Sequence, residues 1–354
     1  MNKLLAIVLA LAIAVSCAAC AKEQKETTPS EAAETKLATQ PAVTEKTAEE
    51  QTGSLVIYAA RDDASADAAV EMFRAAYPNI DVEVVCAGAE ELCRRIEEES
   101  ESPRADILWG MPADVMASMT DYLDSHTCAD GTIGEAYRDA DGLWTGVSPV
   151  PLVILYNKTL IEEWEVPATW EGLCDEDLKG QIAFADPAGS ASAYTQLCTM
   201  LFSQDTIEEG WALVERFAAN LDGVLQENDA ACHELVASGV YALGITTEQA
   251  AAAYSENPDV DYVYPMANSA VPESAAVILG CPNPENAALF LDFLTGTECQ
   301  TAQSADWGRR PVRSDVTPAG MCALEDLDLR EYDYAYAAGN REEILEKWNE
   351  RTGA

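Results

Sequence analysis

Short apolar runs alternate with segments of helical period in the first half of the folded region. The runs LVIYAA (55–60), DVEVVCA (81–87) and ADILWG (105–110) have the length and β-branched content of buried strands. Each is followed by a segment with helically spaced apolar residues: ASADAAVEMFRAAY, GAEELCRRIEEE and PADVMASMTDYL. This βαβαβα series predicts a mostly parallel sheet with helices on both faces.

A second set of elements follows the longer apolar run PLVILYNK (151–158). QIAFADPAGSASAYTQLCTMLF (181–202) predicts a strand, a turn and a helix, and further helices and a strand come next. DYVYPMANSAVPESAAVILG (261–280) predicts a strand, a polar crossing and a return strand. We therefore expect an α/β fold of two lobes between which the chain crosses twice. One lobe is expected to comprise 54–152 plus 270–354, and the other 153–269.

The carboxyl ends of the predicted strands are the expected place for a ligand, because open α/β sheets bind ligands there. The residues at these ends are Ala60, Arg61, Asp62, Gly88, Ala89, Trp109, Gly110 and Met111. Arg61 offers a guanidinium group that pairs with anions through two N–H groups. Trp109 and Trp144 offer faces for stacking, and burial in the core is the alternative. Asp62 and Asp63 precede a helix and are more typical of N-caps than of metal ligands.

A Gly/Ser-rich turn, Asp186–Ala193, opens one of the helices of the second lobe. Its free N–H groups and the positive end of the helix dipole suit a phosphate or phosphonate, and Asp186, Ser190, Ala191 and Ser192 are the candidate contacts. The alternative is that Ser190 or Ser192 only caps the helix. Thr246, Thr247 and Glu248 lie at another strand-to-helix turn, where Glu248 either accepts a hydrogen bond from a ligand or complements its own helix start.

The N-terminal segment predicts export and lipid anchoring. Lys3 precedes twelve apolar residues, too few for a membrane span but typical of a signal peptide. Ala18 and Ala19 before Cys20 resemble a bacterial lipobox, so we expect 1–20 to be a lipoprotein signal peptide with Cys20 acylated. Residues 21–53 have no aromatic residue and no apolar period, which predicts a disordered tether to the membrane.

Charge and composition exclude several classes of function. With 62 Asp+Glu against 21 Lys+Arg, the net charge is −41, and nucleic-acid binding is excluded because it needs clustered Lys and Arg. The only basic cluster is Arg309, Arg310 and Arg313, which either recognises an anion or bridges acidic helices.

His126 and His233 have no ligand-spaced partner, and the nine cysteines after Cys20 show no CxxC pair, so no metal site is predicted. No catalytic signature such as GxSxG or HExxH appears, and we expect no enzyme.

Several stretches together resemble the family 1 extracellular solute-binding proteins, in the branch that includes ferric-iron, phosphonate, sugar-phosphate and thiamine binders. The matching stretches cover nearly all of 54–354 in the family's order: LVIYAARDD, ADILWGMPAD, GLWTGVSPVPLVILYNK, PATWEGLCDEDLKGQIAFADPAGSASAYT, VASGVYALGITTEQAA, GRRPVRSDV and NREEILEKW. The resemblance implies a two-lobed periplasmic-binding-protein fold (type II) that closes on its ligand. It also implies a monomer that delivers solute to the permease and ATPase of an ABC importer.

The resemblance leaves two classes of ligand open. The ferric branch uses neighbouring tyrosines just after the VASGVYALG-like strand, whereas this chain reads ITTEQ (245–249) and has no tyrosine until Tyr254. We therefore expect a phosphonate, a sugar phosphate or a ferric complex, held by Ser190, Ser192 and the arginine cluster. Within that cluster, Arg310 is the residue expected to contact the ligand. Direct binding of ferric iron as transported cargo, or a lipid-anchored sensor that presents a ligand to a receptor, are the alternatives, and no cofactor is expected.

Overall fold

The computed structural model describes residues 47–61, 63–128 and 132–352. The predicted signal peptide, Cys20, the tether up to residue 46 and Asp62 lie outside these residues. Of the expected tether, Ala48–Glu50 form a 3₁₀ turn and Gly53 already belongs to the first strand. No helix in the described part of the chain has the length and apolar character needed to cross a membrane.

In the described part of the chain, nine strands form the sheet in the order β2-β1-β3-β9-β5-β7-β6, with β4 paired to β9 and β8 paired to β5. The strands are β1 (Gly53–Ala59), β2 (Ile80–Cys86), β3 (Ile107–Pro112), β4 (Leu123–Asp124), β5 (Thr145–Asn157), β6 (Ile182–Ala183), β7 (Leu243–Thr247), β8 (Val260–Val263) and β9 (Ala270–Ile278). All three strands predicted for the first half of the chain are present, within three residues of the expected starts.

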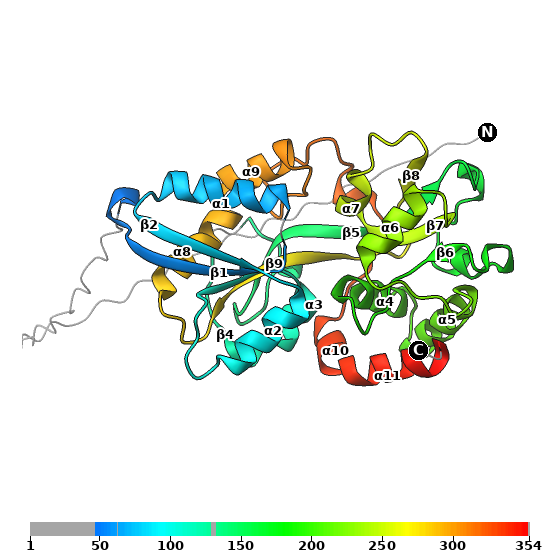
Figure 1. The fold of residues 1–354 in the computed structure, drawn as a ribbon, viewed down its shortest axis with the longest axis horizontal. Helices are drawn as coiled ribbons and strands as arrows, with labels where there is room; N and C mark the ends of the chain where they lie inside the picture. The colour runs from blue at the N-terminus through cyan, green and yellow to red at the C-terminus, as the bar shows by residue number, and fades with distance from the viewer. Residues whose placement is uncertain (1–46, 62, 129–131, 353–354) are drawn as a thin grey trace, which may run out of the picture. The chain divides into compact units, whose positions relative to one another are not determined.

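The helices follow the predicted segments closely. They are α1 (Ala64–Ala76), α2 (Ala89–Glu98), α3 (Ala113–Ser118), α4 (Ala191–Phe202), α5 (Ile207–Asn220), α6 (Asp229–Ala237), α7 (Glu248–Ala252), α8 (Pro284–Thr295), α9 (Thr297–Asp306), α10 (Tyr334–Gly339) and α11 (Arg341–Thr352). Figure 1 shows α1 and α9 on one side of the β1–β2–β3 group and α2 and α3 on the other. Phe73 of α1 meets Phe290 of α8 edge to face at 5.0 Å, which packs these two helices together.

The α/β two-lobed fold class is confirmed, and its sheet is mixed. β1 pairs in parallel with β2 and β3, and β6 pairs in parallel with β7, as a βαβ series requires. The middle of the sheet is antiparallel: β9 pairs with β3 and β5, and β5 pairs with β7 and β8. The cause is the double crossing, because the outgoing strand β5 and the returning strand β9 must run in opposite directions.

β5 and β9 connect the two groups of strands. The first half of β5, Thr145–Pro151, pairs with β9, and its second half, Leu152–Tyr156, pairs with β7. Pro149 stands opposite Pro272 in the β5–β9 register. At the C-terminus, α11 packs against the second group, where Trp348 contacts Phe184 at 5.6 Å between ring centroids. The division into lobes at 152/153 and 269/270 stays a prediction. The first boundary lies inside β5, and the second lies just before β9.

Candidate functional site

A cavity of about 330 Å³ lies where the two groups of strands meet. Ala60 follows β1, Gly110 and Pro112 end β3, and Ala89 begins α2. The connecting strands supply four lining residues, Val150, Leu152, Val271 and Glu273, and the second group supplies five, Ala191, Ser192, Thr195, Thr247 and Gln249. The cavity therefore lies at the carboxyl ends of strands, as open α/β sheets predict.

Two helices of at least ten residues begin at this cavity. α4 is capped by Ser190, whose hydroxyl accepts a hydrogen bond from Ala193 N–H at 3.3 Å, and its first two residues, Ala191 and Ser192, line the cavity. α2 begins after Gly88, which provides no side-chain cap, and its first residue, Ala89, also lines the cavity. Helix N-termini present unsatisfied N–H groups and partial positive charge, so both favour an anion in the cavity.

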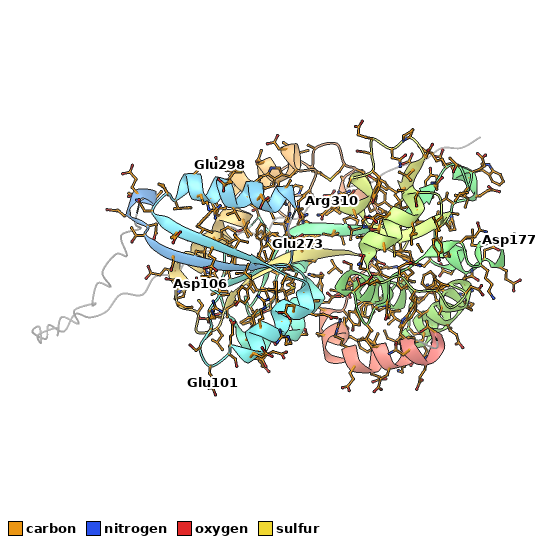
Figure 2. The ribbon with its side chains drawn as sticks, viewed as in Figure 1. Glu101, Asp106, Asp177, Glu273, Glu298 and Arg310 are labelled. Atoms are coloured by element: carbon orange, nitrogen blue, oxygen red, sulfur yellow. The ribbon has the colours of Figure 1, made fainter. Side chains whose placement is uncertain are left out.

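Among the described residues that line the cavity, Glu273 is the one that is charged, and two arginines neutralise it. Its carboxylate lies 2.6 Å from Arg61 Nη1 and also contacts Arg309 Nη2. Burial raises the pKa of Glu273, but Arg309 and Arg61 outweigh burial and hold that pKa below its usual value. Glu273 and Arg310 both lie in the middle of the view in Figure 2, where β9 passes between the two groups of strands.

Arg61 is fixed by further contacts on its other side. Its Nε and Nη2 bond Asp63 at 3.1 and 2.8 Å, and Asp63 is the N-cap of α1, where it accepts the N–H groups of Ser65 and Ala66. The guanidinium also lies over the ring of Trp109, 4.9 Å from its centroid. The preference for an N-cap role at this position is therefore confirmed for Asp63.

Glu248 and Arg310, both predicted to contact ligand, bind each other instead of lining the cavity. Arg310 donates from Nε and Nη2 to the two carboxylate oxygens of Glu248 at 2.6 and 2.8 Å, and Tyr264 Oη donates to the same carboxylate. Arg310 Nη1 donates to Cys322 O at 2.7 Å. A ligand role for either residue stays a prediction that would require this pair to open.

Six of the residues that the sequence placed at the ligand site come together at the cavity: Ala60, Ala89, Gly110, Ala191, Ser192 and Thr247. The other candidates lie elsewhere or one position away. Gly88 and Ser190 cap helices, Asp186 accepts a hydrogen bond from Ala188 N–H, and Thr246 is buried in β7. Trp109 and Trp144 are 2% and 3% exposed and pack edge to face against Phe290 and Tyr334, the core alternative for both.

Sequence reasoning missed the contribution of the connecting strands. Val150, Leu152, Val271 and Glu273 lie inside apolar runs that read as ordinary core strands. Thr195 lies one turn beyond the recognised Ser190–Ser192 turn; its hydroxyl bonds Asp114 of α3 at 2.8 Å, which joins α3 to α4 below the cavity. Gln249 binds Ser148 of β5 at 3.2 Å. One feature of the sequence could have indicated them: the chain was predicted to pass twice between the lobes. Strands that connect two lobes form the floor of the space between the lobes.

Comparisons with known proteins support the same fold. The periplasmic binding protein AfuA from Actinobacillus pleuropneumoniae, solved with fructose-6-phosphate bound, superposes with a TM-score of 0.76 at 20% identity, covering 86% of this chain and 99% of that one. A ferric binding protein from Campylobacter jejuni gives a TM-score of 0.73 at 20% identity, covering 84% of this chain and 99% of that one.

The sequence relatives carry ligand-related names. A Salmonella paratyphi A protein, whose name assigns it to 2-aminoethylphosphonate binding in the periplasm, is 24% identical over 286 residues, covering 77% of this chain and 83% of its own. Iron uptake protein A1 of Synechocystis is 27% identical over 261 residues, covering 67% of this chain and 70% of its own. Residues 68–323 match the model of the family described as bacterial extracellular solute-binding protein. The predicted resemblance is confirmed, and the chain belongs to the bacterial extracellular solute-binding proteins.

Proposed function

We propose that this solute-binding protein captures a small anionic solute, a phosphonate or a sugar phosphate, in the cavity between its two lobes. It then delivers the solute to the permease and ATPase of an ABC importer. The observation that carries the proposal is the convergence of the first residues of α2 and α4 on one cavity whose carboxylate, Glu273, is neutralised by Arg61 and Arg309. Such a surface can accept the negative charge of the solute and exchange its water shell for N–H and hydroxyl groups.

The polar side chains of the cavity suit a solute with several oxygen atoms. Ser192, Thr195, Thr247 and Gln249 add hydroxyl and amide groups on the side of the second lobe. Apart from Glu273, the lining residues of the opposite side and the floor are apolar or small, with Ala60, Val150 and Val271 among them. A few polar groups on a largely apolar wall are typical of small-molecule sites, where they fix orientation and specificity.

The lining favours an anion over bare ferric iron. No tyrosine is among the described residues that line the cavity, and its one carboxylate is already paired with two guanidinium groups. Tyr254, the first tyrosine after the β7 turn, instead bonds His233 at 3.1 Å. A hard trivalent cation would need several anionic oxygen ligands, so iron would enter this cavity as part of an anionic complex.

The proposal places the protein outside the cytoplasmic membrane. The signal peptide 1–20 and acylation of Cys20 would anchor it, and the following segment would tether the binding domain within reach of the permease. The protein acts as a monomer and binds its solute without catalysis in this proposal.

Thermal unfolding of the purified protein, freed of bound solute, tests the proposal. 2-Aminoethylphosphonate, other phosphonates, fructose-6-phosphate and Fe(III)-citrate are added one at a time. A solute at one hundred times its Kd stabilises the folded state by about 2.7 kcal/mol, which raises the unfolding midpoint visibly. A shift with a phosphonate or a sugar phosphate supports the proposal. The proposal is contradicted if ferric iron without citrate shifts the midpoint, or if no solute of the panel shifts it.

Two matched serine variants locate the site. Ser192→Ala removes a hydroxyl from the lining, and we expect affinity to fall more than tenfold, about 1.4 kcal/mol. Ser190→Ala removes the cap of α4 and should mainly lower stability, by about 1 kcal/mol.

Val150→Trp fills the cavity and should abolish binding. Unchanged affinity in both Ser192→Ala and Val150→Trp would place the solute elsewhere.

A further inference from the structure

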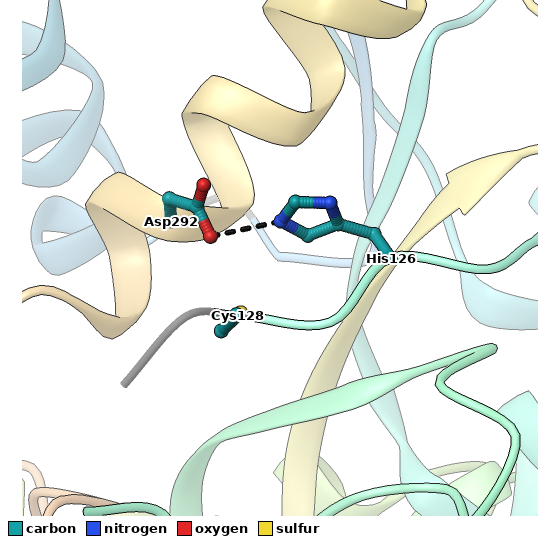
Figure 3. A group of neighbouring side chains, drawn as sticks. All are labelled: His126, Cys128 and Asp292. Atoms are coloured by element: carbon teal, nitrogen blue, oxygen red, sulfur yellow. Dashed lines mark hydrogen bonds and ion pairs between the residues drawn. The ribbon is translucent and has the colours of Figure 1, made fainter. Parts of the chain in front are cut away.

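A second group of side chains, outside the interlobe cavity, has the composition of a metal site. His126 and Cys128 follow β4 with one residue between them, and Asp292 faces them from α8 (Figure 3). One nitrogen of His126, the Cys128 sulfur and a carboxylate oxygen of Asp292 all lie within 4.8 Å of one another. Among the described residues, this is the one group of three His, Cys, Asp or Glu side chains that meets this condition.

We propose that His126, Cys128 and Asp292 bind a divalent transition-metal ion, with Zn²⁺ the best match. Imidazole nitrogen, thiolate sulfur and carboxylate oxygen are the three ligand types that Zn²⁺ takes in proteins, at about 2.0–2.3 Å. The thiolate and the imidazole disfavour Ca²⁺ and Mg²⁺, which require oxygen ligands. It also differs from the interlobe cavity, which offers no sulfur or imidazole among its lining residues.

The three ligands need little movement to surround one ion. His126 Nε2 lies 2.8 Å from Asp292 Oδ1, so the two already face each other, as the dashed line in Figure 3 marks. Ligand atoms bound at about 2.0–2.3 Å to one tetrahedral ion lie roughly 3.5 Å apart. The Asp292 side chain is 46% exposed and His126 is 22% exposed, so both have room to rotate outward around an ion.

The cysteine is held in place by the same helix that carries the aspartate. Cys128 is 8% exposed, and Thr295, nearly one turn beyond Asp292 on α8, has its Oγ1 3.4 Å from the Cys128 sulfur. A hydroxyl near a ligating sulfur orients it and stabilises its charge, as the outer contacts of metal ligands commonly do. The sulfur is therefore positioned before an ion arrives.

An access route and a place for a fourth ligand are both present. A cavity of about 400 Å³ is lined by His126 and Cys128 and also by Glu135 and Asp139. This cavity shares no lining residue with the interlobe cavity. Three protein ligands with one open position is the arrangement of Zn²⁺ sites that keep a water or another small ligand. Arg138 also lines the cavity, and the two carboxylates outweigh its charge, so this cavity attracts cations.

Co²⁺ provides the decisive probe, because thiolate ligation produces a charge-transfer band that carboxylates alone do not. This distinction matters in a chain of net charge −41, to which divalent ions bind weakly at many carboxylates. Titration of the full-length protein with Co²⁺ should give the thiolate band with saturation at one equivalent, and Zn²⁺ should remove it. Weak binding of Co²⁺ without the band would overturn the proposal.

Variants identify the ligands. Cys128→Ser and His126→Gln should each abolish the band at one equivalent of Co²⁺. Cys281→Ser is the matched control, because Cys281 has the same exposed fraction, 8%, and lies just before the same helix, α8. A band that persists in Cys128→Ser, or is lost in Cys281→Ser alone, would overturn the assignment.

A measurement on the unaltered protein covers the case in which a variant does not fold. Alkylation of Cys128, read by mass spectrometry of the digested protein, should slow strongly when Zn²⁺ is present and should not change with Mg²⁺. Equal alkylation rates with and without Zn²⁺ would show that His126 and Asp292 only form an ion pair that fastens the segment after β4 to α8.

Discussion

Arg310 and Glu248, sixty-two residues apart, form a bidentate ion pair with side chains only 1% and 4% exposed. The pair joins the segment after α9 to the first residue of α7, which lies beside Thr247 of the interlobe cavity. Arg310 also donates to Cys322 O, and the Glu248 carboxylate also accepts a hydrogen bond from Tyr264 Oη, so both members of the pair have a further partner. The pair therefore positions α7 and the polar lining residue Gln249 that α7 carries.

Removing one partner of this pair should destabilise the protein strongly. Arg310→Met leaves the Glu248 carboxylate buried without its guanidinium, a change that costs about 3–5 kcal/mol. Urea unfolding measures the loss. Arg94→Met is the control: Arg94 binds Glu91 and Glu98 on the exposed face of α2, where solvent screens the charges, and its loss should leave the urea midpoint almost unchanged. Equal midpoints for the two variants would mean that the buried pair contributes no more than an exposed one.

Gly110 should tolerate no side chain. Its φ is +88°, and an added Cβ would lie 2.8 Å from Arg61 Cγ. Gly110→Ala should therefore cost about 1–3 kcal/mol through backbone strain and displace Arg61 from Glu273, which weakens solute binding. Calorimetry for stability and titration for affinity give the two readouts. Gly339→Ala, where a Cβ meets nothing within 4 Å and φ is not positive, should not lower either one.

Asp229 should make stability depend on pH. Burial raises its pKa to about 6, against the hydrogen bonds of Ser192 and Gln196, which lower it. The folded state therefore keeps a proton that the unfolded chain loses near pH 4, so this stabilisation is full below about pH 4 and is lost as pH rises through 6. Asp229→Asn cannot lose a proton, and its unfolding midpoint should rise relative to the unaltered protein between pH 4 and pH 7.

The same pH series on a second variant provides the comparison. Asp67→Asn removes the charge of an exposed aspartate on α1 and controls for the general effect of one negative charge fewer. If the difference between Asp229→Asn and the unaltered protein were constant across this range, the carboxylate of Asp229 would not titrate there.

Tyr332→Phe should destabilise the contact between α3 and the segment that leads into α10. Tyr332 Oη donates to Asp114 at 2.6 Å, and the same carboxylate accepts Thr195 Oγ1 at 2.8 Å. Asp114 is buried, and its burial raises the pKa of its carboxyl group. Loss of one donor leaves this buried acceptor partly unsatisfied, which should lower the free energy of unfolding by about 1–3 kcal/mol. Tyr334→Phe removes a longer bond, 3.3 Å to Ala136 O near solvent, and should cost about 0.5 kcal/mol or less. Denaturant midpoints compare the two, and a smaller loss for Tyr332→Phe would contradict the role assigned to Asp114.

Local patterns were sufficient for the elements and the fold class, because strand and helix periods are encoded in neighbouring residues. α1, for example, begins at Ala64 and ends at Ala76, and its predicted segment spans 64–77. The sequence predicted a mostly parallel sheet, and the antiparallel direction of the middle strands was not predicted, because the pairings of β9 with β3 and β5 join residues more than one hundred positions apart. Burial of Trp109 and Trp144 was left open for the same reason.

The candidate site was predictable only where it follows one stretch of chain. The turn before α4 placed Ser192 at the cavity because helix starts and strand ends are local features. Glu273 and Arg61 meet across 212 residues, and His126 and Asp292 across 166. Spacing along the chain carries no signal for such pairs. His126 was accordingly set aside in the sequence as a residue without a partner.

The sheet is continuous from β2 to β6, but its hydrogen-bond ladder is thin where β5 and β9 cross. Pro149 stands opposite Pro272 there, with Pro151 two residues further along β5, and none of the three has an N–H group to donate. Twisting one strand against the other at this point therefore breaks few backbone bonds. We therefore expect the two groups of strands to flex at these prolines, and replacing the prolines by residues that have an N–H group should stiffen this part of the sheet.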